Sequence, residues 1–229
     1  MYVRILSLLL FATACLHADT TNWQLPPNES FLKVIQPPPE RGTAATKADL
    51  DYLIALQAHP TKAEVAHAEK SVKFTVFSFS EVRGDHFTSA AYPRTAGFFK
   101  KLEDTANAPK NWLKETMHRE RPYKAFPDQV KQLVTVEGGY SYPSGHSTRA
   151  WLDALVLSDL DPARRADYLA SAAQVSSDRV IGGMHYPSDT VSGRILAQAI
   201  HDDLLDDPLY KTELEELRKA EFSSDKKSP

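Results

Sequence analysis

A segment that is apolar on nearly all sides constrains the fold of this chain most strongly. It follows Ser144 and contains the run from Trp151 to Leu157, in which every residue except Asp153 is hydrophobic. A helix that is hydrophobic all round is stable only when other elements cover it. We therefore expect a helix that opens at Ser144 and forms the centre of the fold.

Helical patterns occur on both sides of this segment, and they end in recognisable caps. Pairs such as Asp161-Pro162 and Asp207-Pro208 place a capping side chain before a proline in the first helical turn. Only Val72–Val76 fits both a strand and a helical stripe. The predicted helices are a first around Leu50–Leu56, a second opened by the capping box Thr61–Glu64, then Arg94–Ala106, Pro109–Arg121, the central helix, Asp161 to about Val180, one from Pro187 or Ser188, and one from Asp207. The sequence thus predicts an all-α single domain.

Length and charge narrow the class of protein further. A chain of 229 residues fits one domain with a sizeable core, and 42% hydrophobic with 25% charged residues is ordinary for a globular protein. The net charge of −3 argues against binding to nucleic acid polymers, which usually requires a basic excess. Any anion site must therefore be built from a few local cations.

Residues 1–18 have the pattern of a secretion signal. Arg4 precedes an apolar run, Ile5–Ala14, that is too short to span a bilayer, and small residues follow at cleavage-site spacing. Cleavage after Ala18 would remove Cys15, the only cysteine, whereas cleavage after Ala14 would leave Cys15 first and open to lipid attachment. We expect export to the periplasm or medium, with no membrane-spanning segment in the mature chain.

The remaining chain divides into three parts. Residues 19–45 form a proline-rich, irregular lead that we expect to lie as a strap over the domain. Residues 46–222 form the helical domain, and residues 223–229 form a frayed tail.

Three short clusters in the second half of the chain carry the chemistry. In the first, Lys114 and Arg121 are seven residues apart, so a continuous helix would place both side chains on one face. Pro122 disfavours helix at the residue before it and places Arg121 at a helix end. Taken alone, such a pair is usually solvated surface.

The second cluster is Ser144-Gly145-His146, at the start of the central helix. Amides at a helix N-terminus attract anions, and Gly145 allows an oxyanion to approach the backbone closely. Ser144 either donates its hydroxyl to that anion or caps the helix. The motif is short, and the simpler alternative is a helix cap beside an incidental His146.

The third cluster, Arg179, His185 and Asp189, is the most specific. Asp189 lies four residues after His185, close enough to accept from Nδ1–H and to leave the Nε2 lone pair for a substrate. The alternatives are a His–Asp pair that closes a helix start, or a metal pair. A zinc site would need three or four ligands, and Arg179 nearby favours an anion instead.

The order Lys-x6-Arg-Pro, Pro-Ser-Gly-His and Arg-x5-His-x3-Asp resembles the type 2 phosphatidic acid phosphatase (PAP2) superfamily. Within it, Gly139–Ser147 and Arg179–His185 are similar to the signature of the bacterial class A non-specific acid phosphatases. The similarity is dense from Lys114 to Arg194. It implies the helical bundle shared by PAP2 phosphatases and vanadium haloperoxidases.

The resemblance also implies a role for each matching residue. His185 would be the nucleophile that forms a phosphohistidine, Asp189 would orient it, and His146 would be the general acid and base. The phosphoryl oxygens would be held by Lys114, Arg121, Ser144, Gly145 and Arg179. Neither a metal nor another cofactor is then required, because fixed cations stabilise the transferred group.

One departure from the family is Asp178, which stands where the family has serine. A carboxylate there could pair with Arg179 or repel substrate, and we expect it to point about 100° away around the helix. Among the other histidines, His118 is a candidate for the pocket rim. No role is assigned to His59, His67, His86 and His201, which we expect at the surface.

The sequence therefore predicts an exported acid phosphatase that hydrolyses small phosphomonoesters, with phosphate transfer to alcohols as an additional reaction and with inhibition by vanadate. The alternatives are a vanadium-dependent haloperoxidase, a membrane-associated lipid or isoprenoid phosphate phosphatase, and an inactive anion-binding protein. The physiological substrate and a homo-oligomeric state are left open.

Overall fold

The structure is a computed structural model that describes residues 22–136 and 138–223. The expected signal 1–18, Cys15 and residues 224–229 of the expected tail lie outside these ranges. Within them the regular elements are all helical, which confirms the all-α prediction.

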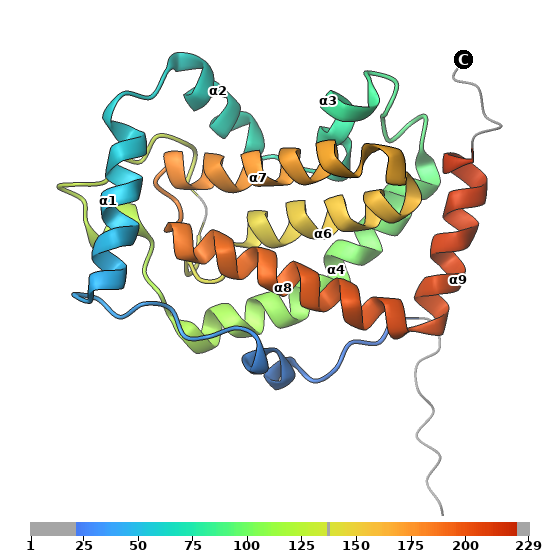
Figure 1. The fold of residues 1–229 in the computed structure, drawn as a ribbon, viewed down its shortest axis with the longest axis horizontal. Coiled ribbons are helices and arrows are strands. Elements are labelled where there is room, and N and C mark those ends of the chain that lie inside the picture. Colours follow the sequence, from blue (N-terminus) through green and yellow to red (C-terminus); the bar gives the residue numbers. More distant parts are fainter. Residues whose placement is uncertain (1–21, 137, 224–229) are drawn as a thin grey trace, which may run out of the picture.

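The central helix is α6 (Gly145–Leu160), as the sequence predicts. It lies between α7 (Arg165–Ile181) and α8 (Pro187–Asp206), with α4 (Pro93–Met117) along another side (Figure 1). A short 3-10 turn, Pro162–Arg164, joins α6 to α7, and a five-residue loop joins α7 to α8. The start of α6, the end of α7 and the start of α8 consequently meet at one end of the molecule.

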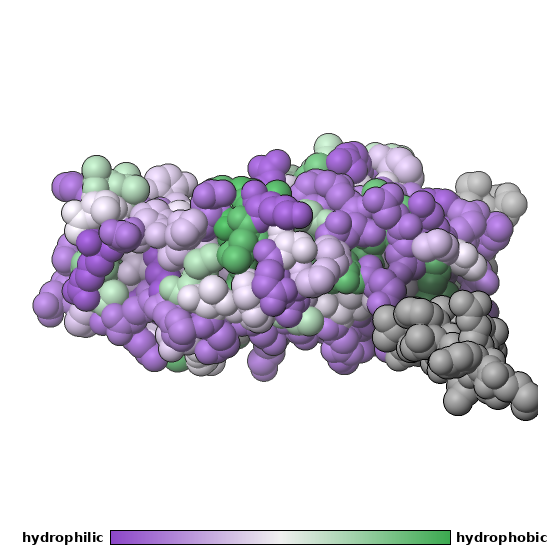
Figure 2. All heavy atoms as spheres, turned by 90° about the horizontal axis from the view of Figure 1, so that it is seen from below, coloured by the Kyte–Doolittle hydropathy of each residue, from purple (hydrophilic) through white to green (hydrophobic). Residues whose placement is uncertain are grey.

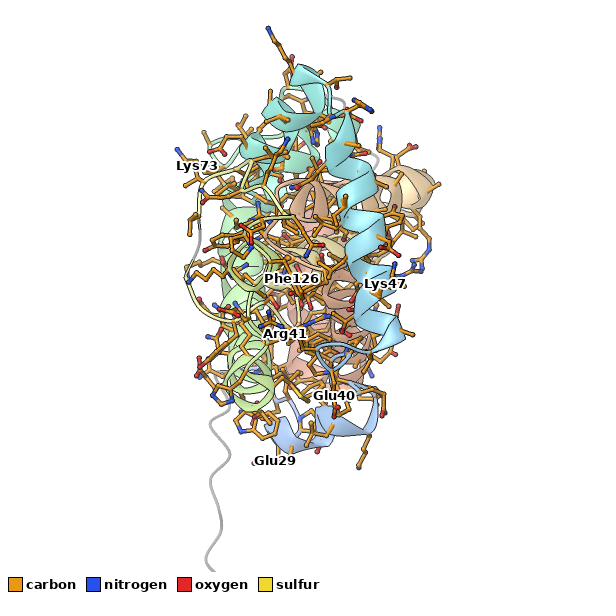
Figure 3. All side chains as sticks on the ribbon, turned by 90° about the vertical axis from the view of Figure 1, so that its left-hand side faces the viewer. Glu29, Glu40, Arg41, Lys47, Lys73 and Phe126 are labelled. Carbon is orange, nitrogen blue, oxygen red and sulfur yellow. The ribbon has the colours of Figure 1, made fainter. Side chains whose placement is uncertain are left out.

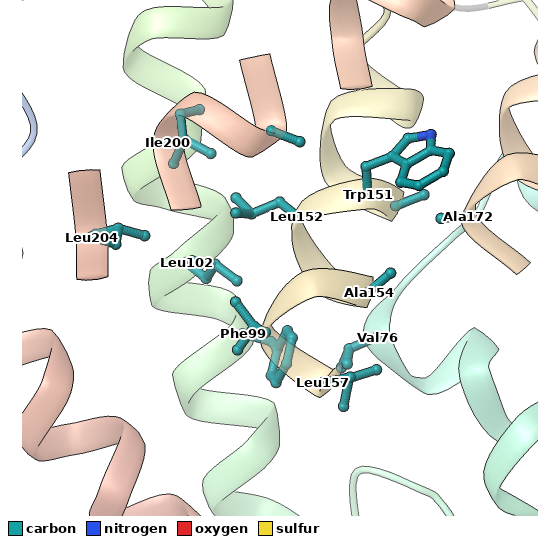
Figure 4. Close-up of a cluster of buried hydrophobic side chains, with 14 of the residues drawn as sticks. Val76, Phe99, Leu102, Trp151, Leu152, Ala154, Leu157, Ala172, Ile200 and Leu204 are labelled. Carbon is teal, nitrogen blue, oxygen red and sulfur yellow. The ribbon is translucent and has the colours of Figure 1, made fainter. Parts of the chain in front are cut away.

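Burial explains why α6 is central. Twelve of its 16 residues are buried. Trp151, Leu152, Ala154 and Leu157 pack with side chains of the surrounding helices, as Figure 4 shows for Phe99 and Leu102 of α4, Ala172 of α7, and Ile200 and Leu204 of α8. Phe98 is buried beside Phe99, so this pair belongs to the core.

The other elements surround these four helices. Both α1 (Ala44–Ala58) and α2 (Lys62–Ser71) contact α7, and α9 (Pro208–Leu217) crosses the far end (Figure 1). The short elements are Asn28–Lys33, Val76–Phe79, α3 (Ser80–Arg83), α5 (Pro122–Ala125) and a final turn, Arg218–Phe222. The capping box of Thr61 and Glu64 is present, and the Asp207 side chain accepts from the amide of Tyr210 at 2.9 Å.

Three predictions about regular structure are wrong. A break before Pro109 was expected, yet α4 is one helix of 25 residues that contains this proline. Phe99 and Leu102 before Pro109 and Leu113 after it are buried in one core, which holds both halves in line despite the lost amide. For Val72–Val76 neither expected pattern forms, because Val76 begins a 3-10 turn.

The third error concerns the end of α4. The helix stops at Met117, and His118 has a left-handed φ of 51°. Arg121 therefore does not share a helical face with Lys114; it is instead the N-terminal flanking residue of α5.

The lead segment crosses the helices and contains one 3-10 turn. Trp23, Phe31 and Ile35 are buried, and the amide of Gln24 donates to Asp207 at 2.8 Å. Further along, the Arg41 guanidinium lies 5.0 Å from the centre of the Phe126 ring, at the end of the molecule that faces the viewer in Figure 3.

The surface seen from below is mostly hydrophilic, with small hydrophobic areas near its middle (Figure 2). Among the described residues, no helix combines the length and the hydropathy needed to cross a membrane.

Gly193 on α8 provides a test of the contact between α8 and the start of α6. A Cβ at this position would lie 2.6 Å from the carbonyl oxygen of Ser144 and 2.9 Å from Cβ of Ser147. We expect Gly193→Ala to lower the free energy of unfolding by about 1–3 kcal/mol, because backbone must shift. Chemical denaturation measures this change.

The matched control is Gly97→Ala in α4, where a Cβ would meet nothing within 4 Å. It should be neutral or stabilising by up to about 1 kcal/mol, since alanine favours helix. Equal stability of the two variants would contradict the close contact at Gly193.

Candidate active site

A cavity of about 460 Å³ lies between α4 and the first half of α6, and its wall is completed by loop residues that include His185 between α7 and α8. Five of the eight predicted site residues line it: Lys114, Arg121, Gly145, His146 and His185. The other three, Ser144, Arg179 and Asp189, are fully buried next to these. The structure therefore brings the three sequence clusters together at one place.

His185 is fixed from both sides of its ring. Its side chain is 1% exposed, its Nδ1 lies 3.3 Å from Oδ2 of Asp189, and its Nε2 lies 3.1 Å from Nη1 of Arg121. Because a carboxylate only accepts, the proton belongs on Nδ1, and the Nε2 lone pair faces the cavity. Burial, followed by the charges of Arg121, Lys114 and Arg179, holds the pKa of His185 well below its usual value. This imidazole is consequently neutral in weak acid.

A tight turn after α7 places His185 opposite Asp189. Gly183 has a φ of +76°, and a Cβ there would lie 2.2 Å from the carbonyl oxygen of Lys131. The carbonyl of Arg179 accepts from the amides of both Met184 and His185. Only glycine fits this close approach and left-handed conformation, so the turn depends on the residue type at position 183.

Arg119 holds the carboxylate that orients His185, and the sequence reasoning missed it. Its guanidinium donates to Oδ1 of Asp189 at 2.6 Å and to Oδ2 of Asp49 at 2.9 Å, and it lies 3.8 Å from the centre of the Tyr186 ring. Burial raises the pKa of Asp189, and the charge of Arg119 opposes that rise. The sequence offered one signal for Arg119, namely its position two residues before Arg121. Its role could not be predicted, because its partner Asp49 is 70 residues away in the sequence.

The loop after α5 brings two cations together although they are not on one helix. The Arg121 guanidinium donates to the carbonyls of Gly138, Gly139 and Met184 at 2.9–3.2 Å. The Lys114 ammonium donates to the carbonyl of Tyr140 at 2.5 Å. Both cations therefore converge on the cavity from different elements. Arg179 is buried on α7, and its charge also acts on His185.

The start of α6 forms another wall of the cavity. Ser144 caps the helix by accepting from the amide of Ser147 at 3.3 Å, so of its two possible roles the structure has the cap. A Cβ on Gly145 would lie 3.3 Å from Cδ of Lys110, which shows how closely the lysine stems pack here. His146 lines the cavity, and its Nε2 donates to the carbonyl of Val72 at 3.0 Å.

Asp178 has partners outside the cavity. Its carboxylate lies 2.9 Å from Nδ1 of His67 on α2 and accepts from Gln174 at 3.0 Å, in agreement with the expectation that it points away around the helix. His67 is thus half-buried and paired.

Two further histidines differ in their surroundings. His201 is buried and paired with Asp159 at 2.8 Å, so the expected surface position is wrong. His118 is exposed, and its ring packs edge-on against Tyr140, which lines the cavity.

Parts of this chain are similar in sequence to known proteins. Residues 105–201 match the family model described as the PAP2 superfamily. A "Non-specific acid phosphatase" of Providencia stuartii is 30% identical over 154 residues, which cover 66% of this chain but 62% of that protein. A "Lipid A 1-phosphatase" of Rhizobium etli is 36% identical over 87 residues, covering 36% of this chain and 37% of that protein.

A solved structure has the same fold. The transmembrane PAP2 type phosphatidylglycerolphosphate phosphatase from Bacillus subtilis matches with a TM-score of 0.51 and 20% sequence identity, over 72% of this chain and 87% of that one. The segment that matches the PAP2 superfamily model, residues 105–201, contains Ser144 at the start of α6 and the His185–Asp189 pair, so this part of the chain is similar to the PAP2 superfamily at its candidate active site.

Proposed function

We propose that this protein hydrolyses phosphate monoesters through a phosphohistidine formed at His185. The observation that carries the proposal is the buried imidazole, which is neutral and whose Nδ1–H points at Asp189. Its Nε2 lone pair faces the cavity beside the guanidinium of Arg121. A neutral, oriented nucleophile surrounded by fixed cations suits attack on a phosphoryl group.

In the first step the phosphoryl oxygens bind among Lys114, Arg121 and Arg179, replacing the contact of Arg121 with Nε2. The Nε2 lone pair of His185 attacks phosphorus, and the bond to the ester oxygen breaks. His146 gives that oxygen a proton, so an alcohol leaves. The positive charge on the His185 imidazole is stabilised by Asp189 through Nδ1–H.

In the second step water attacks the phosphohistidine. His146, now neutral, takes a proton from this water, and the N–P bond breaks to release phosphate and neutral His185. An alcohol in place of water would give phosphate transfer. The amide of Gly145 and the dipole of α6 add stabilisation for the phosphoryl oxygens.

The charges around the cavity also support hydrolysis without a metal ion and inhibition by vanadate, which resembles the pentacoordinate transition state. Among residues 22–136 and 138–223, no group of three or more His, Cys, Asp or Glu side chains has the spacing of metal ligands. The pattern of residues 1–18 supports export to the periplasm or medium.

The central test is hydrolysis of p-nitrophenyl phosphate at pH 5.5 with EDTA present. We expect turnover by the wild type, inhibition by vanadate, and a loss of about a thousandfold or more in His185→Ala, which removes the nucleophile. His59→Ala, at an exposed position after α1, is the matched control and should keep full activity.

Turnover that survives in His185→Ala would contradict the mechanism. Wild-type activity confined to lipid phosphates would favour the lipid phosphatase alternative, which the similarity to the Rhizobium etli protein supports. Oxidation of halide by the vanadate-loaded protein, without ester hydrolysis, would favour a haloperoxidase.

The pH profile tests the protonation states. The low pKa of His185 keeps the nucleophile neutral as pH falls below 6.5, so its protonation reduces the rate only at clearly lower pH. His146 must begin protonated, so we expect kcat/KM to peak below neutral pH. An acid limb centred at pH 6.5, or a rate that rises steadily to pH 9, would show that these assignments are wrong.

Arg119 is a positioning residue in this mechanism. Arg119→Met leaves Asp49 and Asp189 as buried carboxylates without their shared cation, which we expect to lower the free energy of unfolding by about 3–5 kcal/mol. It also removes the charge that opposes the rise in the Asp189 pKa, so Asp189 takes up its proton at higher pH. The acid limb of kcat should therefore move to higher pH.

Arg119→Lys retains the positive charge, so its acid limb should lie closer to the wild-type position than that of Arg119→Met. A purely structural role for Arg119 would lower stability without moving the acid limb. An acid limb of kcat in Arg119→Met at the wild-type position would thus contradict the positioning role.

A further inference from the structure

The cavity extends well beyond the catalytic end, along a groove between α4 and α6. These helices run in opposite directions, because Gly145 at the start of α6 lies against the stem of Lys114 near the end of α4. Further along, Arg149 of α6 donates to Glu103 of α4 at 2.9 Å. Glu103, Arg149 and Asp153 all line the same cavity as His185.

The length of the groove fits a leaving group of moderate size. Gly145 and Asp153 are eight residues apart on α6, which corresponds to about 12 Å at 1.5 Å per residue. A phosphoryl group held at the cation end would therefore place an attached sugar-sized group alongside Arg149 and Asp153. The charged side chains at this end suit a polar group and disfavour an acyl chain.

Asp153 is the unusual residue of this groove. It is 2% exposed, and among the described residues its Oδ2 has no hydrogen-bond partner. The nearest cation is Nε of Arg149 at 3.8 Å, beyond hydrogen-bond distance. Buried carboxyl groups normally have partners, and the hydrolytic mechanism makes no use of this one.

The surroundings of Asp153 determine what it can bind. Burial raises the pKa of Asp153 to about 8; Arg149 opposes the rise, and Glu103 adds to it. In weak acid the carboxyl group is therefore neutral, and it both donates and accepts hydrogen bonds. Phe74 and Leu152 supply apolar surface in the same cavity. Hydroxyl groups on a carbon ring match this combination of a donor–acceptor group with apolar walls.

We propose that Asp153, together with Glu103 and Arg149, forms a subsite that binds hydroxyl groups of the leaving alcohol and selects phosphate monoesters of sugar-like alcohols. The inference rests on the proposed phosphatase function and names the substrate class of the same site. It assigns a role in specificity to three residues at the far end of the cavity from His185.

The test compares two esters that differ in their hydroxyl groups. For each variant we would measure kcat/KM for glucose 6-phosphate and for phenyl phosphate and take the ratio of the two values. Asp153→Leu removes the polar group at similar size and should lower this ratio about tenfold, because the sugar hydroxyls lose a partner. Asp153→Asn keeps a donor and an acceptor and should stay within about threefold of the wild-type ratio.

Glu103→Met provides a second variant at a half-exposed position, where folding is not at risk. It should also lower the ratio, since Glu103 lines the groove and holds Arg149. Asp104→Asn is the matched control: Asp104 is the next residue on α4, is exposed and pairs with Lys100. It should leave the ratio unchanged.

An unchanged ratio in both Asp153→Leu and Glu103→Met, with normal turnover of phenyl phosphate, would overturn this inference alone. If Asp153→Leu fails to unfold cooperatively, the Glu103→Met ratio decides. A wild-type preference for a long-chain lipid phosphate over glucose 6-phosphate would also overturn it. Failure of the wild type to hydrolyse any of these esters would overturn the proposed function itself.

Discussion

A chain of buried charges, from Asp49 through Arg119 to Asp189 and His185, is the interaction on which the site depends. The proposed nucleophile, His185, must be neutral and oriented, and burial beside cations achieves the first requirement. Orientation requires a buried carboxylate, which is costly unless another charge compensates it. Arg119 provides that charge and ties Asp189 on α8 to Asp49 on α1, so the outer helix α1 supports the His185–Asp189 pair through a side chain that does not line the cavity.

The packing of α6 fixes the rest of the geometry. Because this helix is covered on nearly all sides, its neighbours are held in register, and their ends meet in one place. The absence of a side chain at Gly193 lets α8 approach the carbonyl of Ser144, which brings the start of α6 next to Asp189. The core thus sets the distance between the start of α6, where we propose that phosphate binds, and the His185–Asp189 pair. On its other side α6 faces α4, and these two helices form the walls of the groove that we propose for the leaving group.

Features that depend on near neighbours in the chain were predictable, and those that depend on distant ones were not. The caps at Thr61 and Ser144 and the His185–Asp189 spacing involve residues three or four apart, so the sequence alone indicated them. The continuity of α4 through Pro109 results from core packing on both sides of the proline. Sequence patterns of neighbouring residues do not predict such packing. Likewise, Arg121 reaches the site from a loop, and the partner of Arg119 comes from another helix. In the sequence, Asp153 is a single polar residue in an apolar run. Only the structure shows that it lines the cavity, which is the basis of the subsite that we propose.

The most direct test of this account is to trap the covalent intermediate. Wild-type protein and His185→Asn would be mixed with 32P-labelled p-nitrophenyl phosphate at pH 5.5, quenched in alkali within milliseconds, and digested for peptide mapping. The account predicts a label that is stable in base and labile in acid, formed faster than steady-state turnover, located on the peptide containing His185, and absent from the variant. Turnover by the wild type without any such label, or a label on the peptide containing His146, would contradict it.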